Sequence, residues 1–317
     1  MTRIGSVLTG LRRRLRAVNA AAAAVEVDHW KTVEEKARRG VRQFWLNHPR
    51  VAYHYHRKAL VDGLSWQEWI VRRFGGPVPH ALELGCGNGA AALALVRQGV
   101  AAHITGIDLE ETRFAESRAS AAGALDFIAG DINQLQLEPC RYDLVYALQS
   151  FHHFERLEEI MYQVSRALKP GGYFILDEFV GPARFQWTDL QLSLTAHILG
   201  LLPRHLRMYE HGIEKLAEAR STVEQVVAVC PSEAIRSDEI VNVFEHEFDV
   251  IQHRRLGGTL QHLLYSGIIH NFPDGDVNVD RMIDCIDGLE TAMIETGMLG
   301  SDFALLIGTP VRPHSIR

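Results

Sequence analysis

Between residues 77 and 181, short apolar runs alternate with longer amphipathic segments. The apolar runs predict five strands, at His80–Leu84, His103–Ile107, Leu125–Ala129, Tyr142–Ala147 and Tyr173–Phe179. The segments between them predict helices at Asn88–Arg97, Glu110–Ala122 and Leu157–Leu168, and the breaker Lys169-Pro170-Gly171-Gly172 closes the last helix. Strands that alternate with crossover helices form a parallel α/β sheet. Such a sheet binds its ligands at the carboxyl ends of its strands.

The flanking segments follow a different pattern. Residues 26–72, 186–245 and 259–298 read as helical, and Phe248–Arg255 and Phe303–Gly308 read as two further strands. We therefore predict an N-terminal helical cap or lid over residues 1–72. A single α/β domain would follow over residues 73–317, with helical insertions at about 186–245 and 259–298.

The first 25 residues predict a basic amphipathic helix. Arginines occur at positions 3, 12, 13, 14 and 16 with no acidic residue before Glu26, and Ile4, Leu8, Leu11 and Leu15 recur at helical spacing. Three interpretations remain open. The helix could pack on the fold or on a second copy in a homodimer, lie on a membrane surface, or act as a transit-like leader.

Composition excludes several classes of protein. The 317 residues carry a formal net charge of -6, with a pI near 6.2, which argues against a general nucleic-acid binder. The four cysteines are scattered without a CxxC pair, which favours reduced thiols in a cytoplasm over disulfides or a zinc site. The sequence has no apolar run of about 18 residues, so we expect no membrane-spanning helix.

The segment Glu83-Leu84-Gly85-Cys86-Gly87-Asn88-Gly89 lies between a predicted strand and a predicted helix. Its glycines allow a sharp turn and a close approach of the backbone to a ligand. Gly85, Gly87 and Ala90 also satisfy the dinucleotide pattern G-x-G-x-x-A, so the loop alone leaves an NAD(P)-dependent oxidoreductase open. Glu83 favours a ligand with a positively charged amino-acid end, because a carboxylate there would repel a pyrophosphate.

Residues at the ends of the next strands complete the predicted cofactor site. Asp108 ends the second strand, where a carboxylate can accept hydrogen bonds from a ribose diol. Asp131 follows the third strand, where it could accept from an adenine amino group, and Gln149 follows the fourth strand.

Taken together, Glu83–Gly89, Asp108, Gly130-Asp131, Tyr142–Ala147 and Leu168–Gly172 resemble, in order and spacing, the motifs of class I S-adenosyl-L-methionine (SAM)-dependent methyltransferases. The resemblance implies a Rossmann-like seven-stranded sheet, mostly parallel, with the last strand antiparallel. It also implies SAM as cofactor and S-adenosyl-L-homocysteine as product. The implied contacts are those of the methionine part with Glu83, Gly85 and Gly87, of the ribose with Asp108, and of the adenine with Asp131 and Ile132. The further residues expected to bind the cofactor are Cys86, Asn88, Leu109 and Gln149.

A narrower resemblance to bacterial small-molecule methyltransferases covers Glu178–Trp187, Pro231–Ser237 and Gly257–Thr259. It implies a small-molecule acceptor, a natural product or a saccharide, and we favour O-methylation. A SAM-binding protein without turnover remains an alternative.

Three side chains near the expected strand ends are candidates for a general base: His152, His153 and Glu178. The alternative for the histidines is packing or a hydrogen bond to the cofactor, and for Glu178 a salt bridge to Arg184 or Arg236. Methyl transfer needs no metal, and we predict none. We expect Tyr53–His56 to form an aromatic lid over the acceptor rather than a metal site.

Overall fold

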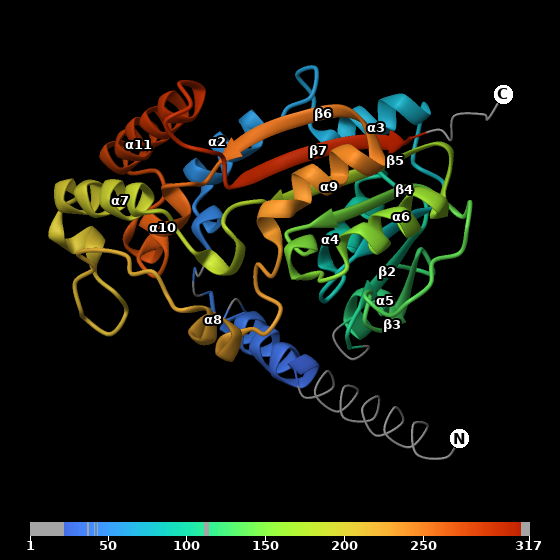
Figure 1. The fold of residues 1–317 in the computed structure, drawn as a ribbon, viewed down its shortest axis with the longest axis horizontal. Helices are drawn as coiled ribbons and strands as arrows, with labels where there is room; N and C mark the ends of the chain where they lie inside the picture. Colours follow the sequence, from blue (N-terminus) through green and yellow to red (C-terminus); the bar gives the residue numbers. More distant parts are fainter. Residues whose placement is uncertain (1–21, 37, 41, 43, 111–113, 312–317) are drawn as a thin grey trace, which may run out of the picture.

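The computed structural model of the protein describes residues 22–36, 38–40, 42, 44–110 and 114–311 (Figure 1). Most of the predicted basic helix, including all its arginines, lies outside these residues. Among the residues that the structure describes, no helix is both long enough and apolar enough to span a membrane.

Seven strands form one sheet with the order β3-β2-β1-β4-β5-β7-β6. Strands β1 to β5 pair in parallel, whereas β7 runs antiparallel to both of its neighbours. The predicted Rossmann-like sheet with an antiparallel last strand is therefore confirmed. The strands are β1 (Ala81–Leu84), β2 (Ile104–Asp108), β3 (Leu125–Ala129), β4 (Tyr142–Leu148), β5 (Leu168–Phe179), β6 (Phe248–Gly257) and β7 (Phe303–Pro310).

Helices connect these strands and extend beyond them. Residues 22–36 form a helix. The others are α2 (Pro49–Lys58), α3 (Trp66–Phe74), α4 (Ala90–Arg97), α5 (Ala115–Ser120), α6 (Leu157–Ala167), α7 (Asp189–Leu201), α8 (Val223–Val229), α9 (Ile240–Glu247), α10 (Gln261–Tyr265) and α11 (Val277–Glu295). A short 3₁₀ helix, Phe151–His153, follows β4.

The sheet buries both faces because its strands alternate side chains between two hydrophobic clusters. On one face, Leu82, Val145 and Phe174 pack with α6 and α9, and the rings of Phe174 and Phe244 stack at 5.5 Å. On the other face, Ile104, Leu144 and Ile307 pack with α2, α3 and α4. A sheet covered on both faces leaves the carboxyl edge of its strands for ligands.

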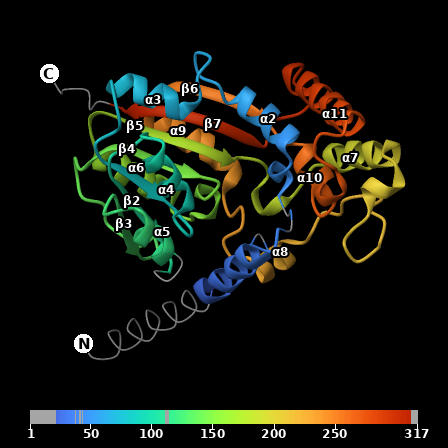
Figure 2. The ribbon, with the colours of Figure 1, turned by 180° about the vertical axis from the view of Figure 1, so that it is seen from behind.

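Two groups of helices surround that edge. Helices α7, α10 and α11 gather beyond one end of the sheet, whereas helix 22–36 lies beside α8 (Figures 1 and 2). The hydroxyl of Ser232, just after α8, donates to the carboxylate of Glu26 at 2.6 Å. Segments about 200 residues apart in sequence thus meet at one place.

The helix before the breaker Lys169–Gly172 ends at Ala167, within one residue of the prediction, but the breaker itself belongs to β5, which begins at Leu168 instead of Tyr173. Tyr142 pairs with Leu168 and Leu144 pairs with Tyr173, so residues 169–172 bulge opposite the single residue Asp143. The ammonium of Lys169 bonds that aspartate at 2.9 Å, and Gly171 supplies a φ of 83°. The breaker therefore makes a bulge within a strand.

Two helical predictions are also too long. Residues 208–222 lack helix, because the chain turns between Met208 and Glu214 and Lys215 buries its ammonium against the carbonyl oxygens of Leu263 and Ser266. Helix α5 covers only part of the predicted 110–122 segment, since Ala115 is its first residue.

Candidate functional site

The glycine loop after β1 is held by Asp108 at the end of β2. The carboxylate of Asp108 accepts the backbone N–H of Gly87 at 2.7 Å and that of Leu109 at 2.8 Å. Gly85 has a φ of 71°, and a Cβ there would lie 2.5 Å from the Cβ of Ser150. A side chain at this position would therefore clash, which explains the glycine.

A cavity of about 470 Å³ opens above this loop at the carboxyl ends of β1, β2 and β4. Its size is that of a small-molecule site. Of the predicted residues, it is lined by Gly85, Gly87, Asp108, Leu109, Asp131, Ile132, Gln149 and His153. Glu83, Cys86, Asn88, His152 and Glu178 do not line it.

Three of the predicted residues outside the lining, Glu83, Cys86 and Asn88, belong to the glycine loop segment itself. Glu83 is buried and accepts a hydrogen bond from the hydroxyl of Tyr146 at 3.2 Å. Burial, reinforced by the charge of Asp108, raises the pKa of Glu83 to about 8. The side chain of Asn88 accepts the backbone N–H of Ala90 at the start of α4, and Cys86 is buried.

Gln149 adopts a left-handed backbone conformation, with a φ of 54°. Its side-chain amide donates to the hydroxyl of Tyr55 at 3.2 Å and to Asp177 at 3.1 Å. Non-glycine residues at positive φ are uncommon and often occur at functional sites. Tyr55, which belongs to α2, thus holds Gln149 in the cavity wall.

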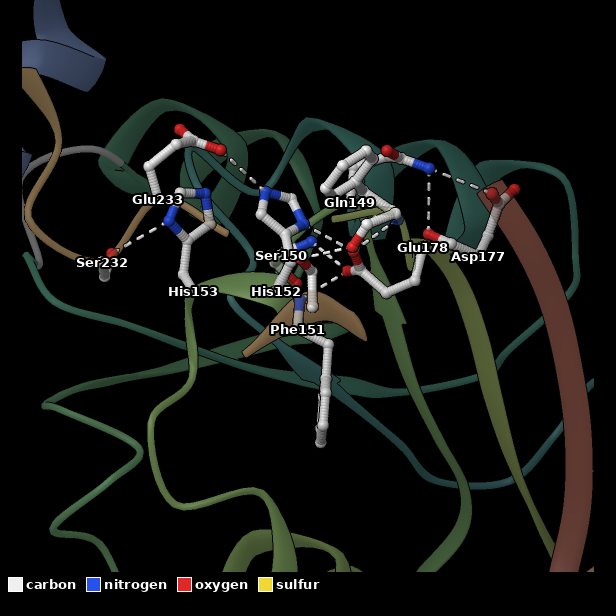
Figure 3. Close-up of polar contacts among 12 residues, drawn as sticks. Gln149, Ser150, Phe151, His152, His153, Asp177, Glu178, Ser232 and Glu233 are labelled. Carbon is white, nitrogen blue, oxygen red and sulfur yellow. Dashed lines mark hydrogen bonds and ion pairs between the residues drawn. The ribbon is translucent and has the colours of Figure 1, made fainter. Parts of the chain in front are cut away.

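The two adjacent histidines have different environments (Figure 3). The carboxylate of Glu178 accepts from Nδ1 of His152 at 2.6 Å and from the backbone N–H groups of Ser150 and Phe151. Burial opposes protonation of His152, but the charge and hydrogen bond of Glu178 outweigh it and raise the pKa to about 10. Burial and the neighbouring His152 lower the pKa of His153 to about 3.

The salt bridges expected between Glu178 and Arg184 or Arg236 do not form. Glu178 faces His152, whereas the Arg184 guanidinium donates to the backbone oxygens of Pro231 and Glu233. Arg236 pairs with Glu158 and Glu239.

The lid predicted at Tyr53–His56 is misplaced, because none of these residues lines the cavity. Tyr55 is buried against Trp45, and His54 lies between Asp284 and Asp287 of α11. The helical period of α2 directs Tyr55 into the core and His54 toward α11, and neither side chain extends over the strand ends.

The residues that cover the cavity come from helix 22–36, within the segment predicted as a cap or lid, and from residues 231–235, and none of them is among the predicted site residues. Helix 22–36 contributes Ala22, Ala23, Glu26, Val27 and Trp30, and the ring of Trp30 lies 5.5 Å from that of His153. Glu26 gives no local signal, because its role depends on a contact with Ser232 far along the chain. Pro231, Ser232 and Ile235 fall in the segment of the narrower resemblance.

Comparison with known proteins agrees with this geometry. Residues 82–176 match a family described as "Methyltransferase domain". The fatty-acid O-methyltransferase of Mycolicibacterium smegmatis is 32% identical over 153 residues, which cover 47% of this chain and 55% of that protein. A probable phthiotriol/phenolphthiotriol dimycocerosates methyltransferase of Mycobacterium ulcerans is 33% identical over 122 residues, 38% of this chain and 42% of that protein.

A solved SAM-dependent methyltransferase from Mesorhizobium loti aligns with 76% of this chain and 96% of its own, with 16% identity and a TM-score of 0.42. The chain spans about half the length of the curated relatives that it matches. The matches confirm the resemblance to class I SAM-dependent methyltransferases over residues 82–176. They count against the oxidoreductase interpretation of the glycine loop.

Proposed function

We propose that this chain is a SAM-dependent methyltransferase that transfers a methyl group to a small lipid-like acceptor, with O-methylation favoured. The observation that carries the proposal is the glycine loop locked by Asp108 at the floor of a cavity within a methyltransferase domain. Methyl transfer from a sulfonium requires alignment of the acceptor with the methyl group and exclusion of water. The cavity walls supply both.

The cofactor lies along the carboxyl ends of β1 to β3 in this proposal. The methionine part sits on Gly85 and Gly87, the ribose on Asp108, and the adenine beside Asp131 and Ile132. All five residues line the cavity. The carboxylate of Asp108 belongs to the cavity lining, which places it to accept hydrogen bonds from the ribose hydroxyls.

The acceptor class follows from the cavity wall and the relatives. Val27, Trp30, Phe154 and Ile235 line the cavity with apolar surface, which suits an apolar acceptor. The relatives' names specify a fatty acid and phthiotriol or phenolphthiotriol dimycocerosates. A lipid-like carboxylic acid or alcohol therefore has more support than the natural product or saccharide implied by the narrower resemblance.

His153 is the acceptor-facing residue among the three predicted as general base, because it alone of them lines the cavity. Its low pKa keeps it uncharged at neutral pH, so it accepts a hydrogen bond from the acceptor without holding a proton strongly. A carboxylic acid acceptor is already ionised at neutral pH and needs no base. Glu178 holds His152, whose ring packs beside that of His153 with the ring centroids 4.2 Å apart.

Calorimetric titration with SAM, S-adenosylhomocysteine and NADH tests the cofactor. We expect micromolar binding of the first two and none of NADH. A methyl-labelled SAM assay with a fatty acid, a fatty alcohol and a hexose then tests the acceptor, and label in either lipid supports the proposal. Binding of NADH alone would overturn the cofactor, label in the sugar alone would overturn the acceptor class, and SAM binding without transfer to any acceptor would favour a SAM-binding protein without turnover.

A further inference from the structure

His152, His153 and Glu233 bring three potential metal-binding atoms together beside the cavity. These atoms, one from each side chain, lie within 4.8 Å of one another. Nε2 of His152 is 3.5 Å from a carboxylate oxygen of Glu233. Ligand atoms about 2.1 Å from a tetrahedral zinc ion lie roughly 3.4 Å apart, so this spacing fits two ligands of one ion.

Hydrogen bonds fix which nitrogen of each histidine can face a metal ion. The Nδ1 of His152 faces the Glu178 carboxylate at 2.6 Å, and that carboxylate also accepts backbone N–H groups. Nδ1 of His152 is therefore the protonated nitrogen, and Nε2 points to Glu233. A carboxylate behind a ligating histidine in this way is the usual arrangement in metal sites.

The second histidine is oriented by a chain of two hydrogen bonds. The hydroxyl of Ser232 donates its proton to Glu26 at 2.6 Å, so its oxygen must accept from Nδ1 of His153, 2.9 Å away. The lone pair of His153 is consequently on Nε2. That atom is buried and has no hydrogen-bond partner among the described residues. Figure 3 shows the two rings side by side beneath the carboxylate of Glu233.

The local charge favours a cation. Glu26, Glu178 and Glu233 face this cluster, and the guanidinium of Arg184 lies near it. The carboxylates thus outnumber this guanidinium in a largely buried place, and buried negative charge is costly unless a cation balances it.

A second group, formed by Glu26, His153 and Cys230, also brings three such atoms together. It would use Nδ1 of His153, which lies 3.7 Å from Glu26 and 3.9 Å from the Cys230 sulfur. The hydrogen bond to Ser232 occupies that nitrogen, so the first group is the better site.

We propose that His152, His153 and Glu233 bind a divalent transition-metal ion of the zinc class, with Glu178 orienting His152. Two imidazoles and one carboxylate suit such ions and leave coordination positions open for another ligand. Since His153 lines the cavity, an oxygen of the acceptor could occupy an open position, and the ion would then take the place of the hydrogen bond proposed between His153 and the acceptor. That role rests on the proposed methyl transfer, whereas metal binding itself does not.

Cobalt(II) and zinc(II) titrations of the chelator-treated full-length protein test the site. We expect one Co²⁺ per chain, with the visible absorption of a four- or five-coordinate ion, displaced by Zn²⁺. Glu233→Gln removes the charged ligand, and His153→Asn retains a donor near Nδ1 while it removes Nε2. Each should weaken binding at least tenfold. Cys230→Ala and His246→Ala, an exposed histidine, serve as controls and should bind the metal as the wild type does.

Thermal unfolding and SAM titration of the metal-free variants separate a lost ligand from a damaged fold. Failure of the wild-type protein to bind Co²⁺, or equal affinity in Glu233→Gln, would overturn the metal site. Loss of binding in Cys230→Ala with retention in Glu233→Gln would assign the ion to the second group instead. SAM binding without metal binding leaves the proposed function intact, and metal binding without SAM binding refutes only that function.

Discussion

Asp108 bonds the backbone of the glycine loop with both of its oxygens. Replacing it with alanine removes two charge-assisted hydrogen bonds and the acceptor for the ribose. Because hydrogen bonds to charged groups contribute about 1.5–3 kcal/mol each, we expect Asp108→Ala to weaken SAM binding by about 10- to 100-fold or more in calorimetry. Asp126→Ala, at an exposed carboxylate on neighbouring β3, is the matched control. Equal effects of the two substitutions would contradict the role of Asp108.

Glu83 makes SAM binding depend on pH in a specific direction. Burial raises its pKa to about 8, so it is largely protonated in the free protein at neutral pH. The cationic amino group of bound SAM favours the ionised carboxylate. Affinity should therefore rise between pH 6 and pH 8, by at most about tenfold per pH unit, and Glu83→Gln should flatten the profile.

Calorimetry of 5′-methylthioadenosine provides the control for this prediction, since that compound lacks the amino acid part. Its affinity should not change over the same pH range. A flat SAM profile in the wild-type protein would show that Glu83 does not respond to the cofactor.

Helix α2 is fastened to α11 by a row of charged side chains. Arg50 and His54 both contact Asp284, at 2.6 and 2.7 Å, and Lys58 contacts Asp287 at 2.5 Å. Arg50 and Asp284 are each more than a third exposed, so solvent weakens the pair. We expect Asp284→Ala to lower the free energy of unfolding in urea by about 1 kcal/mol, and Asn278→Ala, an exposed site on the same helix, to change it little. SAM affinity should not change in either variant, and a loss in Asp284→Ala would mean that this pair reaches the cofactor site.

Elements with a strong local pattern could be predicted from the sequence, and those set by distant contacts could not. The apolar run at Leu125–Ala129 defines β3 without help from the rest of the chain. The bulge at 169–172 depends on Asp143 in a neighbouring strand, and the chain after Met208 depends on the burial of Lys215. Neither contact can be predicted from the residues that adjoin these segments in the sequence, because both partners lie elsewhere in the chain.

The same distinction divides the candidate site. The glycine loop, Asp108 and Asp131 follow consecutive strands, so the order of strands alone brings them to one edge. The covering helix 22–36 and Glu233 come from opposite flanks of the domain, and their contacts arise only in the folded chain.

For the whole molecule, buried Asp302 predicts how stability varies with pH. Burial, reinforced by the charge of Glu290, raises the pKa of Asp302 to about 7, whereas an aspartate in the unfolded chain has its ordinary pKa of 3.8. The folded state therefore binds more protons between these values, and its stability should fall as pH rises from about 4 to 7. Asp302→Asn removes this contribution, which amounts to no more than about 4 kcal/mol, since one pKa unit corresponds to about 1.4 kcal/mol.

Urea unfolding at pH 5 and pH 7.5 measures this difference. The stability of Asp302→Asn relative to the wild-type protein should improve at the higher pH. The difference in the free energy of unfolding between the two proteins cancels the contributions of other buried acids such as Asp177. An unchanged difference between the two pH values would show that Asp302 does not titrate in this window.

The position of β7 between β5 and β6 has a consequence for how the chain acquires its fold during synthesis. β5 and β6 do not pair with each other in the described sheet, and both depend on a strand that begins only at Phe303. A nascent chain that has left the ribosome as far as residue 300 thus presents two unsatisfied strand edges, which are prone to aggregation. We expect a ribosome-stalled chain that ends before β7 to be bound by chaperones. A longer stalled chain, with β7 outside the ribosome, should no longer be bound.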